Sequence, residues 1–363
     1  MKRRQFLTRG ALGAVAAGAA TALASPALSQ NRKKWRMVTT WPKGSPGLMT
    51  GANVVAEFIN KASSGRLTVE LYGANEIVPA FEALNTVVSG SVEMGHGYPS
   101  YWSGIHSAMN FLAPVPFGLT PQEQYAWFRY GGGNELSEEL YSELGLKFFV
   151  SGNVMAQGHG WFNREINSIE DYKGLKMRIG GLGGRVVAAA GATVVSIPLG
   201  EVLQSLQTGN IDAAEFVGPL NDMAFGLYQA ASNYYWPGWQ EPSGIMDCFI
   251  NMDAWNGLDD DLKEIVRGAN GLANEVVMSE YVARNADALQ AMTNQHGVTV
   301  KYLSDSTLES LAKLAKDVVE EEAAKTPMSG RIHESMTTFL KKVAPYSTAA
   351  DAAFLNARAK FVS

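Results

Sequence analysis

The chain contains a single cysteine, Cys248, and only five histidines among its 363 residues. One cysteine cannot form an intramolecular disulfide, and scattered histidines without further cysteines do not build a zinc site. Positive charge is also in deficit, because the formal net charge is −5 and the pI is near 5.7. A nucleic-acid-binding protein needs a basic surface for phosphates, so that class is excluded. Stability must come from packing.

Charged residues make up only 18% of the chain, whereas 46% of the residues are hydrophobic and 10% are aromatic. This composition is far from the polar and highly charged range in which chains stay disordered. Single hydrophobic cores stop growing at roughly 250 to 300 residues. A chain of 363 residues exceeds that size, so we expect a folded protein with two lobes.

Residues 1–29 have the composition of an export signal. Lys2, Arg3 and Arg4 precede an uncharged stretch rich in Ala and Gly, and small residues suited to cleavage follow. The signal could be of the twin-arginine type or serve the Sec route. A membrane anchor is the alternative, although the stretch is shorter than the ~20 apolar residues that span a bilayer. Removing this segment removes four positive charges, so the mature protein should be soluble and exported with a net charge of −9 (−5 − 4).

Strand and helix patterns alternate after the signal. Residues 36–40 resemble a strand, 50–63 place apolar residues at helical spacing, and 67–72 alternate between apolar and polar residues as a half-buried strand does. This β-α-β order predicts an α/β fold.

Two distant segments follow the same pattern. Residues 82–93 and 201–212 each begin with Glu, continue as a short helix, and reach a Gly and a short strand at the same offsets. Chance similarity is the alternative, since this order is common in α/β proteins. A true repeat would mean two lobes of similar construction. Ligands of open α/β sheets bind beyond the carboxyl ends of strands, so both segments should then face one cleft.

Arg178 lies at the end of a predicted strand and precedes a glycine-rich turn at 180–184. A guanidinium matches a carboxylate with two parallel hydrogen bonds, which suggests an anchor for an organic acid. A structural ion pair within one lobe explains the pattern equally well. The glycines do not follow the spacing of dinucleotide or P-loop motifs, so a nucleotide site is disfavoured.

Several motifs resemble the solute receptors of tripartite ATP-independent periplasmic (TRAP) transporters. These are Leu175-Lys176-Met177-Arg178, the run from Ile197-Pro198-Leu199 through Glu201 to Glu215, Gly160-Trp161-Phe162, and residues 234–241. Gly160-Trp161-Phe162 and residues 234–241 resemble the branch of this family that binds 2-oxo and 2-hydroxy monocarboxylates such as pyruvate and lactate. The resemblance implies a two-lobed periplasmic binding protein with a ligand cleft between the lobes and a long C-terminal helix.

The same resemblance implies roles for individual residues. Arg178 would grip the carboxylate, while Gln157, Glu215, the carbonyl of Phe216 and Glu241 would hold Na⁺ or Ca²⁺, which in turn would contact the solute. Two carboxylates and an amide oxygen are hard ligands that suit these cations. Without a cation, the two glutamates in one pocket would repel each other.

Aromatic residues are candidates for the pocket wall. Tyr101 is expected to contact the solute, and Tyr98, Trp102, Trp236 and Trp239 could line the pocket or belong to the core. His159 could reach the solute or be structural. The branch usually has Trp where this chain has Phe216, and Gln240 and Pro242 also depart from its commonest pattern, which leaves the solute open.

The predicted domains are residues 1–29 as export signal, 31–155 with 246–290 as lobe 1, 156–245 with 291–330 as lobe 2, and 331–363 as a C-terminal helical segment. That segment must bury its apolar face, and the resemblance implies a homodimer. We therefore expect a periplasmic receptor, not an enzyme, that binds a small organic acid and delivers it to membrane permease subunits. The alternatives are an exported enzyme acting on an organic acid, or a receptor of the same fold for another carboxylate.

Overall fold

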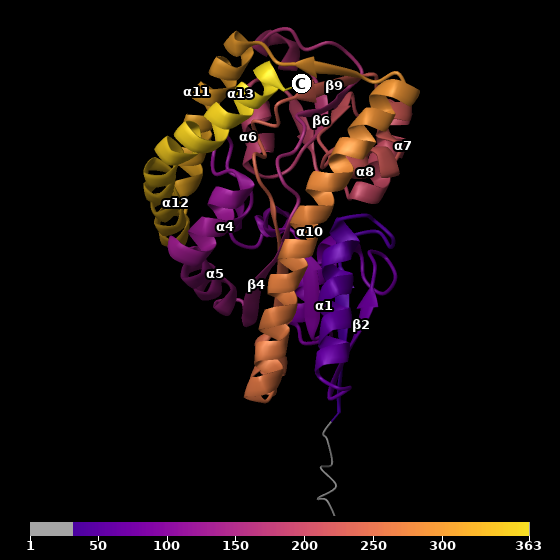
Figure 1. Cartoon of the computed structure of the whole chain (residues 1–363), viewed down its shortest axis with the longest axis vertical. Helices are drawn as coiled ribbons and strands as arrows, with labels where there is room; N and C mark the ends of the chain where they lie inside the picture. The colour runs from indigo at the N-terminus through magenta and orange to yellow at the C-terminus, as the bar shows by residue number, and fades with distance from the viewer. Residues whose placement is uncertain (1–31, 363) are drawn as a thin grey trace, which may run out of the picture.

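The computed structural model describes residues 32–362. The predicted export signal at 1–29 lies outside the described residues. Within the described part of the chain, no helix combines the length and apolarity that a bilayer crossing requires. Strands and helices alternate along the first two thirds of the chain, and helices dominate the last third (Figure 1).

The first sheet has the strand order β2-β1-β3-β10-β4. Its strands are β1 (Lys33–Thr39), β2 (Leu67–Tyr72), β3 (Met94–Gly97), β4 (Leu146–Asn153) and β10 (Ile245–Asn251). β1 pairs with β2 and β3 in parallel, whereas β10 is antiparallel to both β3 and β4. The predicted strand at 67–72 is confirmed, because alternation of apolar and polar residues marks a sheet with one buried face.

The second sheet has the order β11-β9-β5-β8-β6-β7. Its strands are β5 (Gly160–Phe162), β6 (Lys176–Arg178), β7 (Thr193–Val195), β8 (Ala213–Ala214), β9 (Asn233–Trp236) and β11 (Thr299–Tyr302). β6 is parallel to β7 and β8, and β5 is antiparallel to β8 and β9. Apart from β11, the pairing repeats that of the first sheet. The expectation of two α/β units of similar construction is confirmed.

The repeated segments occupy equivalent places in the two sheets. In each, a short helix, α2 (Ala83–Val88) or α7 (Val202–Gln207), ends before a glycine and leads to an inner strand, β3 or β8. Gly90 and Gly209 have φ values of 72° and 71°. Glycine adopts this left-handed conformation without a Cβ penalty, which explains why the same residue ends both helices.

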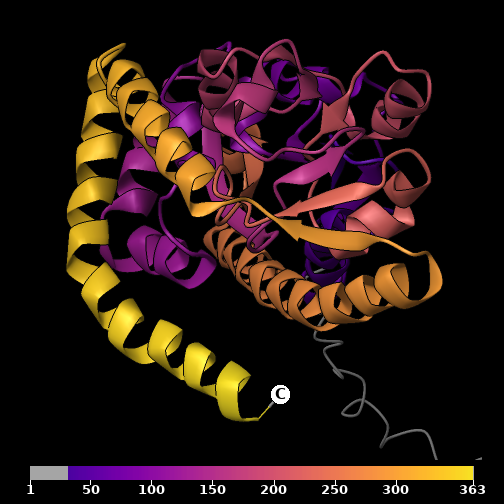
Figure 2. The same cartoon turned by 90° about the horizontal axis from the view of Figure 1, so that it is seen from above.

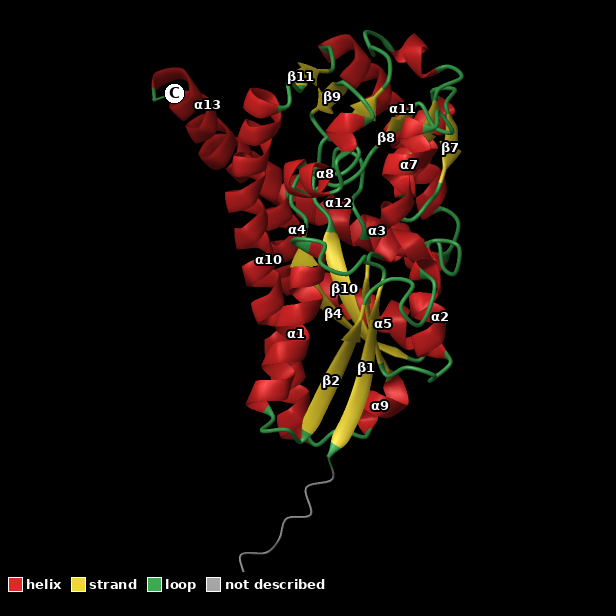
Figure 3. Cartoon of the chain, turned by 90° about the vertical axis from the view of Figure 1, so that its right-hand side faces the viewer, coloured by secondary structure: helices red, strands yellow, loops and turns green. Residues whose placement is uncertain are grey.

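The remaining helices cover and flank the sheets (Figure 3). They are α1 (Leu48–Ala62), α3 (Met109–Leu112), α4 (Pro121–Tyr130), α5 (Gly133–Ser142), α6 (Gly181–Ala189), α8 (Pro219–Ala224), α9 (Met252–Asn256), α10 (Asp260–Gln295), α11 (Asp305–Ala323), α12 (Pro327–Ser347) and α13 (Ala353–Phe361). Side-chain caps begin two of the long ones: Ser304 accepts from Thr307 N at α11, and Thr326 accepts from Ser329 N at α12.

The two sheets do not have separate cores. One buried cluster contains Phe148 of the first sheet and Phe162 of the second, and the other contains Trp35 and Trp161. The 36-residue helix α10 packs on α1 and β4 of the first half and on α8 of the second. The two halves are therefore packed against each other.

Two of the predicted domain boundaries fall inside helices. Position 290 lies within α10 and position 330 lies within α12, so neither is a break in the chain. Helical periodicity continues through both positions, so the sequence pattern itself does not mark a boundary there. The division into lobes itself remains a prediction.

α12 lies along one side of the protein, and the chain beyond it continues away from the body (Figure 2). α12 packs on α3, α4, α5 and α11, and a π-helical turn at Thr348–Ala352 connects it to α13. α13 has no buried residue. The expected C-terminal helical segment is present.

Candidate functional site

A small cavity lies where strands of both sheets end. β3 delivers Tyr98 and Tyr101 to it, β6 delivers Arg178, and β8 delivers Glu215 and Phe216. The two repeated segments thus face one cleft, as the carboxyl-end rule for α/β sheets predicts.

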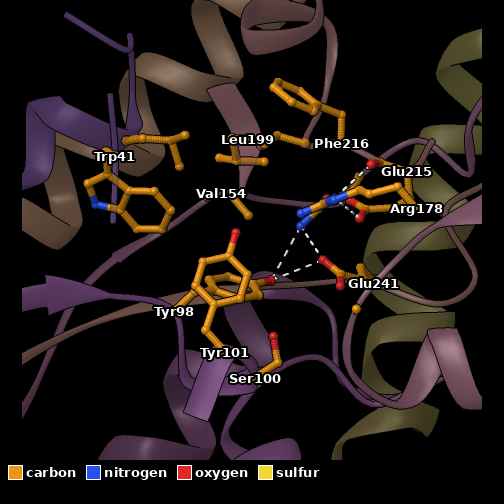
Figure 4. Close-up of a pocket in the computed structure, with 14 residues that line it drawn as sticks. Trp41, Tyr98, Ser100, Tyr101, Val154, Arg178, Leu199, Glu215, Phe216 and Glu241 are labelled. Atoms are coloured by element: carbon orange, nitrogen blue, oxygen red, sulfur yellow. Dashed lines mark hydrogen bonds and ion pairs between the residues drawn. The ribbon is translucent and has the colours of Figure 1, made fainter. Parts of the chain in front are cut away.

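Arg178 and Glu215 form a buried ion pair at the polar end of the cavity (Figure 4). β6 and β8 are adjacent parallel strands, and Arg178 pairs in register with Ala214, which brings the two side chains together. Arg178 Nη1 donates to the Glu215 carbonyl oxygen at 2.7 Å and to its Oε2 at 2.8 Å, and Arg178 Nε donates to Ile197 O at 3.4 Å. These contacts involve Nη1 and Nε, and the guanidinium also interacts with the Tyr101 hydroxyl.

Of the two explanations of Arg178 that the sequence left open, the structural ion pair is present, and the role as an anchor for an organic acid stays a prediction. The guanidinium is paired with a glutamate of its own sheet, and it also lines the cavity.

Glu241, Gln157 and Tyr98 form a second polar group beside this pair. Tyr98 OH donates to Glu241 Oε2 at 3.1 Å, and Gln157 Nε2 donates to the same carboxylate and to Tyr98 OH. Gln157 N also donates to the Glu241 carbonyl at 3.1 Å. Gln157 and Glu241 lie on the two segments that cross between the sheets, so these bonds tie the crossing segments to the site.

The two carboxylates are destabilised as anions. Burial raises the pKa of the Glu241 carboxyl to about 7, although Tyr98 and Arg178 oppose the rise. Burial, and then the charge of Glu241, raise the pKa of Glu215 well above its usual range, with Arg178 opposing. One guanidinium cannot neutralise two ionised carboxylates. The ionised site therefore has one excess negative charge in a buried place, which favours binding of a cation.

Two oxygen atoms of this group lack partners. Gln157 Oε1 and Glu215 Oε1 are buried and accept no hydrogen bond from any described residue. Leaving such acceptors unpaired costs free energy, and a hard cation would satisfy both. No group of three or more His, Cys, Asp and Glu residues suited to a metal occurs within 32–362. The donors here, two carboxylates plus neutral oxygens, instead suit Na⁺ or Ca²⁺.

The other end of the cavity is apolar. Its wall is formed by Trp41, Leu48, Val154, Leu199, Phe216 and Val217. The Phe216 ring is supported by Phe225, with ring centroids 5.0 Å apart. Figure 4 shows Trp41 on the side of the cavity opposite Arg178 and Glu241. The cavity suits a small molecule with a charged head and a short apolar tail.

Buried groups outside the cavity hold its loops. Asp222 Oδ1 accepts from Gly218 N at 3.1 Å, and its Oδ2 accepts from Trp161 Nε1 at 2.9 Å, which fixes the loop after Phe216. His159 Nδ1 lies 2.9 Å from Gln240 Oε1, and Gln240 Nε2 donates to Gly158 O. His159 therefore has a structural role, and the hydrogen bond from Gln240 to Gly158 holds the loop that carries Glu241 in place.

The structure brings all the residues expected at the site together. Gln157, Arg178, Glu215, Phe216, Glu241 and Tyr101 line the same cavity. Sequence patterns missed Trp41, Leu48, Val154, Leu199 and Val217, and left Tyr98 undecided. Trp41 follows the end of β1, which is parallel to β3, so the carboxyl-end rule could have placed it at the same edge.

Two similar α/β units that enclose a small cavity from both sides define a two-lobed solute-binding protein. Comparisons with known proteins assign the family. The family model "Bacterial extracellular solute-binding protein, family 7" (DctP) matches residues 37–326. A monocarboxylate 2-oxoacid-binding periplasmic protein of Nostoc sp. is 38% identical over 351 residues, which cover 94% of this chain and 95% of that protein. The chain belongs to the DctP family.

Solved structures agree with this assignment. A TRAP periplasmic solute-binding protein from Pseudoalteromonas atlantica, solved with bound sodium and pyruvate, has a TM-score of 0.87 at 35% identity, covering 90% of this chain and 99% of that one. A homologue from Bordetella bronchiseptica, a mixed-occupancy dimer with copurified calcium and picolinate, has a TM-score of 0.88 at 31% identity, covering 91% and 98%. The predictions of this fold and of a receptor rather than an enzyme are confirmed.

Arg178→Ala should abolish solute binding, because the variant loses the guanidinium and leaves the Glu215 carboxylate buried without its partner. Loss of one member of a buried charged pair costs ~2 to 5 kcal/mol, or roughly 30-fold to several-thousand-fold in affinity. Arg178→Lys should also bind weakly, since an ammonium cannot reproduce the planar fork. Isothermal titration calorimetry measures the affinity, and circular dichroism checks the fold. Arg267→Ala, at a half-exposed arginine outside the cavity, is the control. Near-native affinity in either Arg178 variant would contradict the assignment.

Proposed function

We propose that this protein is the periplasmic receptor of a TRAP transporter and binds a small 2-oxo monocarboxylate, such as pyruvate, through Arg178 and a bound Na⁺ or Ca²⁺. The buried pair of unpartnered oxygens beside Arg178, on Gln157 and Glu215, carries the proposal. The names of the Nostoc and Pseudoalteromonas relatives support this solute class and the periplasmic location. A 2-hydroxy acid such as lactate presents oxygens at the same two carbons and is the second candidate.

Each part of the site has a distinct task in this proposal. Gln157, Glu215, Glu241 and the Phe216 carbonyl would hold the cation, which supplies a positive charge for the solute oxygens. Arg178 donates to the solute carboxylate, and the aromatic wall excludes water, so these bonds form in a low-dielectric place. The solute leaves unchanged, because the receptor delivers it to membrane permease subunits.

The charges at the site favour a divalent cation when the solute is present. Two ionised glutamates and one guanidinium leave one negative charge, and a monocarboxylate adds a second. Ca²⁺ cancels both charges, whereas Na⁺ leaves one of them buried. Since an uncompensated buried charge is costly, we expect Ca²⁺ to support tighter solute binding than Na⁺ does.

Solute and cation should bind interdependently. Chelation in sodium-free buffer should weaken pyruvate binding at least tenfold, which corresponds to about 1.4 kcal/mol of coupling, and pyruvate should strengthen cation binding by the same factor. Glu215→Gln and Glu241→Gln should weaken the binding of both cation and solute, whereas Glu309→Gln, at an exposed glutamate, should change neither affinity.

Lowering the pH from 8 to 6 should also weaken cation binding, because protons compete with the cation for the Glu241 carboxylate. Titrations at fixed ionic strength check each point, and equal affinity in all buffers would exclude the cation.

Closure of the two lobes should depend on contacts between them outside the cavity. The buried side chain of Asn221 on α8 donates to the carbonyl of Pro46, in the loop before α1, at 2.9 Å and accepts from Tyr281 on α10 at 2.8 Å. Opening of the cleft would break the bond to Pro46. Asn221 thus stabilises the closed state without lining the cavity.

Asn221→Ala should therefore weaken pyruvate binding roughly tenfold, since a smaller closed population lowers the apparent affinity. Small-angle scattering should show a smaller radius of gyration for the wild type with saturating solute than without it. The variant should need more solute to reach the same decrease. Asn294→Ala, at an exposed position near the end of α10, is the matched control. An unchanged scattering profile under proven saturation would contradict closure.

We also propose that α12 and α13 mediate a homodimer. Phe354, Leu355 and Phe361 of α13 are 64%, 48% and 75% exposed, and an apolar helix face of this kind needs a partner. The Bordetella homologue was described as a dimer.

Replacing Phe354 and Leu355 together by Asp should convert dimers to monomers in size-exclusion chromatography with light scattering. Pyruvate affinity should stay within about twofold of the wild type, because neither residue lines the cavity. Asn356→Ser, at another exposed residue of α13, is the control for disturbance of the helix. An unchanged mass in the double variant would remove α13 from the interface.

A further inference from the structure

The apolar end of the cavity is closed by an indole whose polar atom is already occupied. Trp41 Nε1 donates to His96 Nδ1 at 2.9 Å, with the two rings in an edge-to-face arrangement and their centroids 6.1 Å apart. Figure 4 shows the indole nitrogen on the outer side, away from Arg178, and the six-membered ring on the inner side. The solute therefore meets a carbon surface at this end.

His96 is itself firmly held. It lies on β3 in register with Thr39 and Cys248 on the two neighbouring strands, and it has no exposed surface. Gly51 of α1 lies so close that a Cβ there would be 3.2 Å from His96 Nε2. Because the indole N–H is only a donor, His96 Nδ1 must be the acceptor, which fixes the neutral Nε2–H tautomer. Burial lowers the pKa of His96 to about 4, so the ring stays neutral at physiological pH.

The opposite end of the cavity is equally fixed. Arg178 is bonded to Glu215, and Glu241 is bonded to Tyr98 and Gln157, so the position of the solute's charged head is set. The distance available to the solute's tail is then limited by the wall that faces this polar group.

We propose that Trp41, positioned by its hydrogen bond to His96, sets the maximum length of the solute's side chain and is thus a specificity-determining residue. The inference rests on the proposed function, since it takes the head group to be a 2-oxo carboxylate held by Arg178 and the cation. His96 acts through Trp41 and is a positioning residue.

The expected selectivity follows from packing. A tail that exceeds the space before the indole must displace a ring that is both buried and hydrogen-bonded, so affinity should fall steeply beyond a certain chain length. Each methylene in a well-fitted apolar pocket changes affinity by roughly 10-fold or more. A smaller residue at position 41 should extend the accepted length, whereas binding of the shortest solute should lose only its contact with the ring.

The test measures the dissociation constants of pyruvate and of straight-chain 2-oxo acids with four to six carbons, at saturating Ca²⁺. The readout is the affinity for 2-oxohexanoate relative to pyruvate. Trp41→Leu should raise this ratio at least tenfold over the wild type, and Trp41→Phe should raise it less. Trp255→Phe, at a buried tryptophan that packs on Phe149 outside the cavity, should leave the ratio unchanged.

His96 is tested by the same ratio, which a general loss of stability would not change. His96→Leu removes the acceptor of the indole N–H and should raise the ratio at least threefold, whereas His96→Gln retains an acceptor and should restore most of the selectivity. Should Trp41→Leu fail to fold, Trp41→Phe and His96→Leu still decide the question. If the wild type binds pyruvate but the ratio stays constant in these variants, this inference is wrong and the proposed function stands. If the wild type binds no 2-oxo acid with either cation, both are overturned.

Discussion

The site depends on the burial of two carboxylates beside one guanidinium. Glu215, Glu241 and Arg178 are each 6% exposed or less, so their charges are shielded very little by solvent. The parallel pairing of β6 and β8 brings Arg178 and Glu215 together, and the crossing segments bring Glu241 and Gln157 to the same place. The arrangement leaves a negative charge and two unpartnered oxygens. A bound cation would compensate that charge and also attract the anionic solute, which is why we expect cation and solute to bind interdependently.

The repeated connectivity of the two sheets explains how distant residues reach this place. β3 and β8 occupy equivalent inner positions, so the residues that follow them, Tyr98 and Glu215, enter the cavity from opposite sides. The segments that connect the sheets are also bonded to each other, since Val154 N donates to Gly244 O at 2.9 Å next to the site. The predicted cation ligands on these segments, Gln157 and Glu241, therefore lie where a hinge motion would move the backbone.

Local patterns in the sequence predicted much of this structure, and the residues that escaped prediction share a physical cause. Alternation of apolar and polar residues predicted β2. The two similar helix-glycine-strand segments predicted the inner strands β3 and β8, and the ends of these strands predicted the position of the cleft. The resemblance added Gln157 and Glu241, which no spacing rule connects. Leu48 and Val154 could not be identified, because an apolar residue beside a cavity has the same pattern as one in the core. The boundaries predicted at 290 and 330 fall within α10 and α12, because helical periodicity does not mark where one lobe ends.

The polar and apolar ends of the cavity should differ in how they tolerate substitution. Each polar side chain contacts at least one other member of the site, so a change in one leaves another buried group unpaired, at a cost of ~1 to 3 kcal/mol or more. The side chains of the apolar wall contact one another through dispersion forces. A substitution there changes the shape of the cavity without leaving a charge uncompensated. Phe216 illustrates the difference: its carbonyl belongs to the predicted cation site, while its ring, where the resemblance leads one to expect Trp, packs on Phe225. A substitution that keeps the backbone in place can therefore change the wall and preserve the ligand. In the proposed receptor, the charged end would therefore set the class of solute, and the apolar end would set its size.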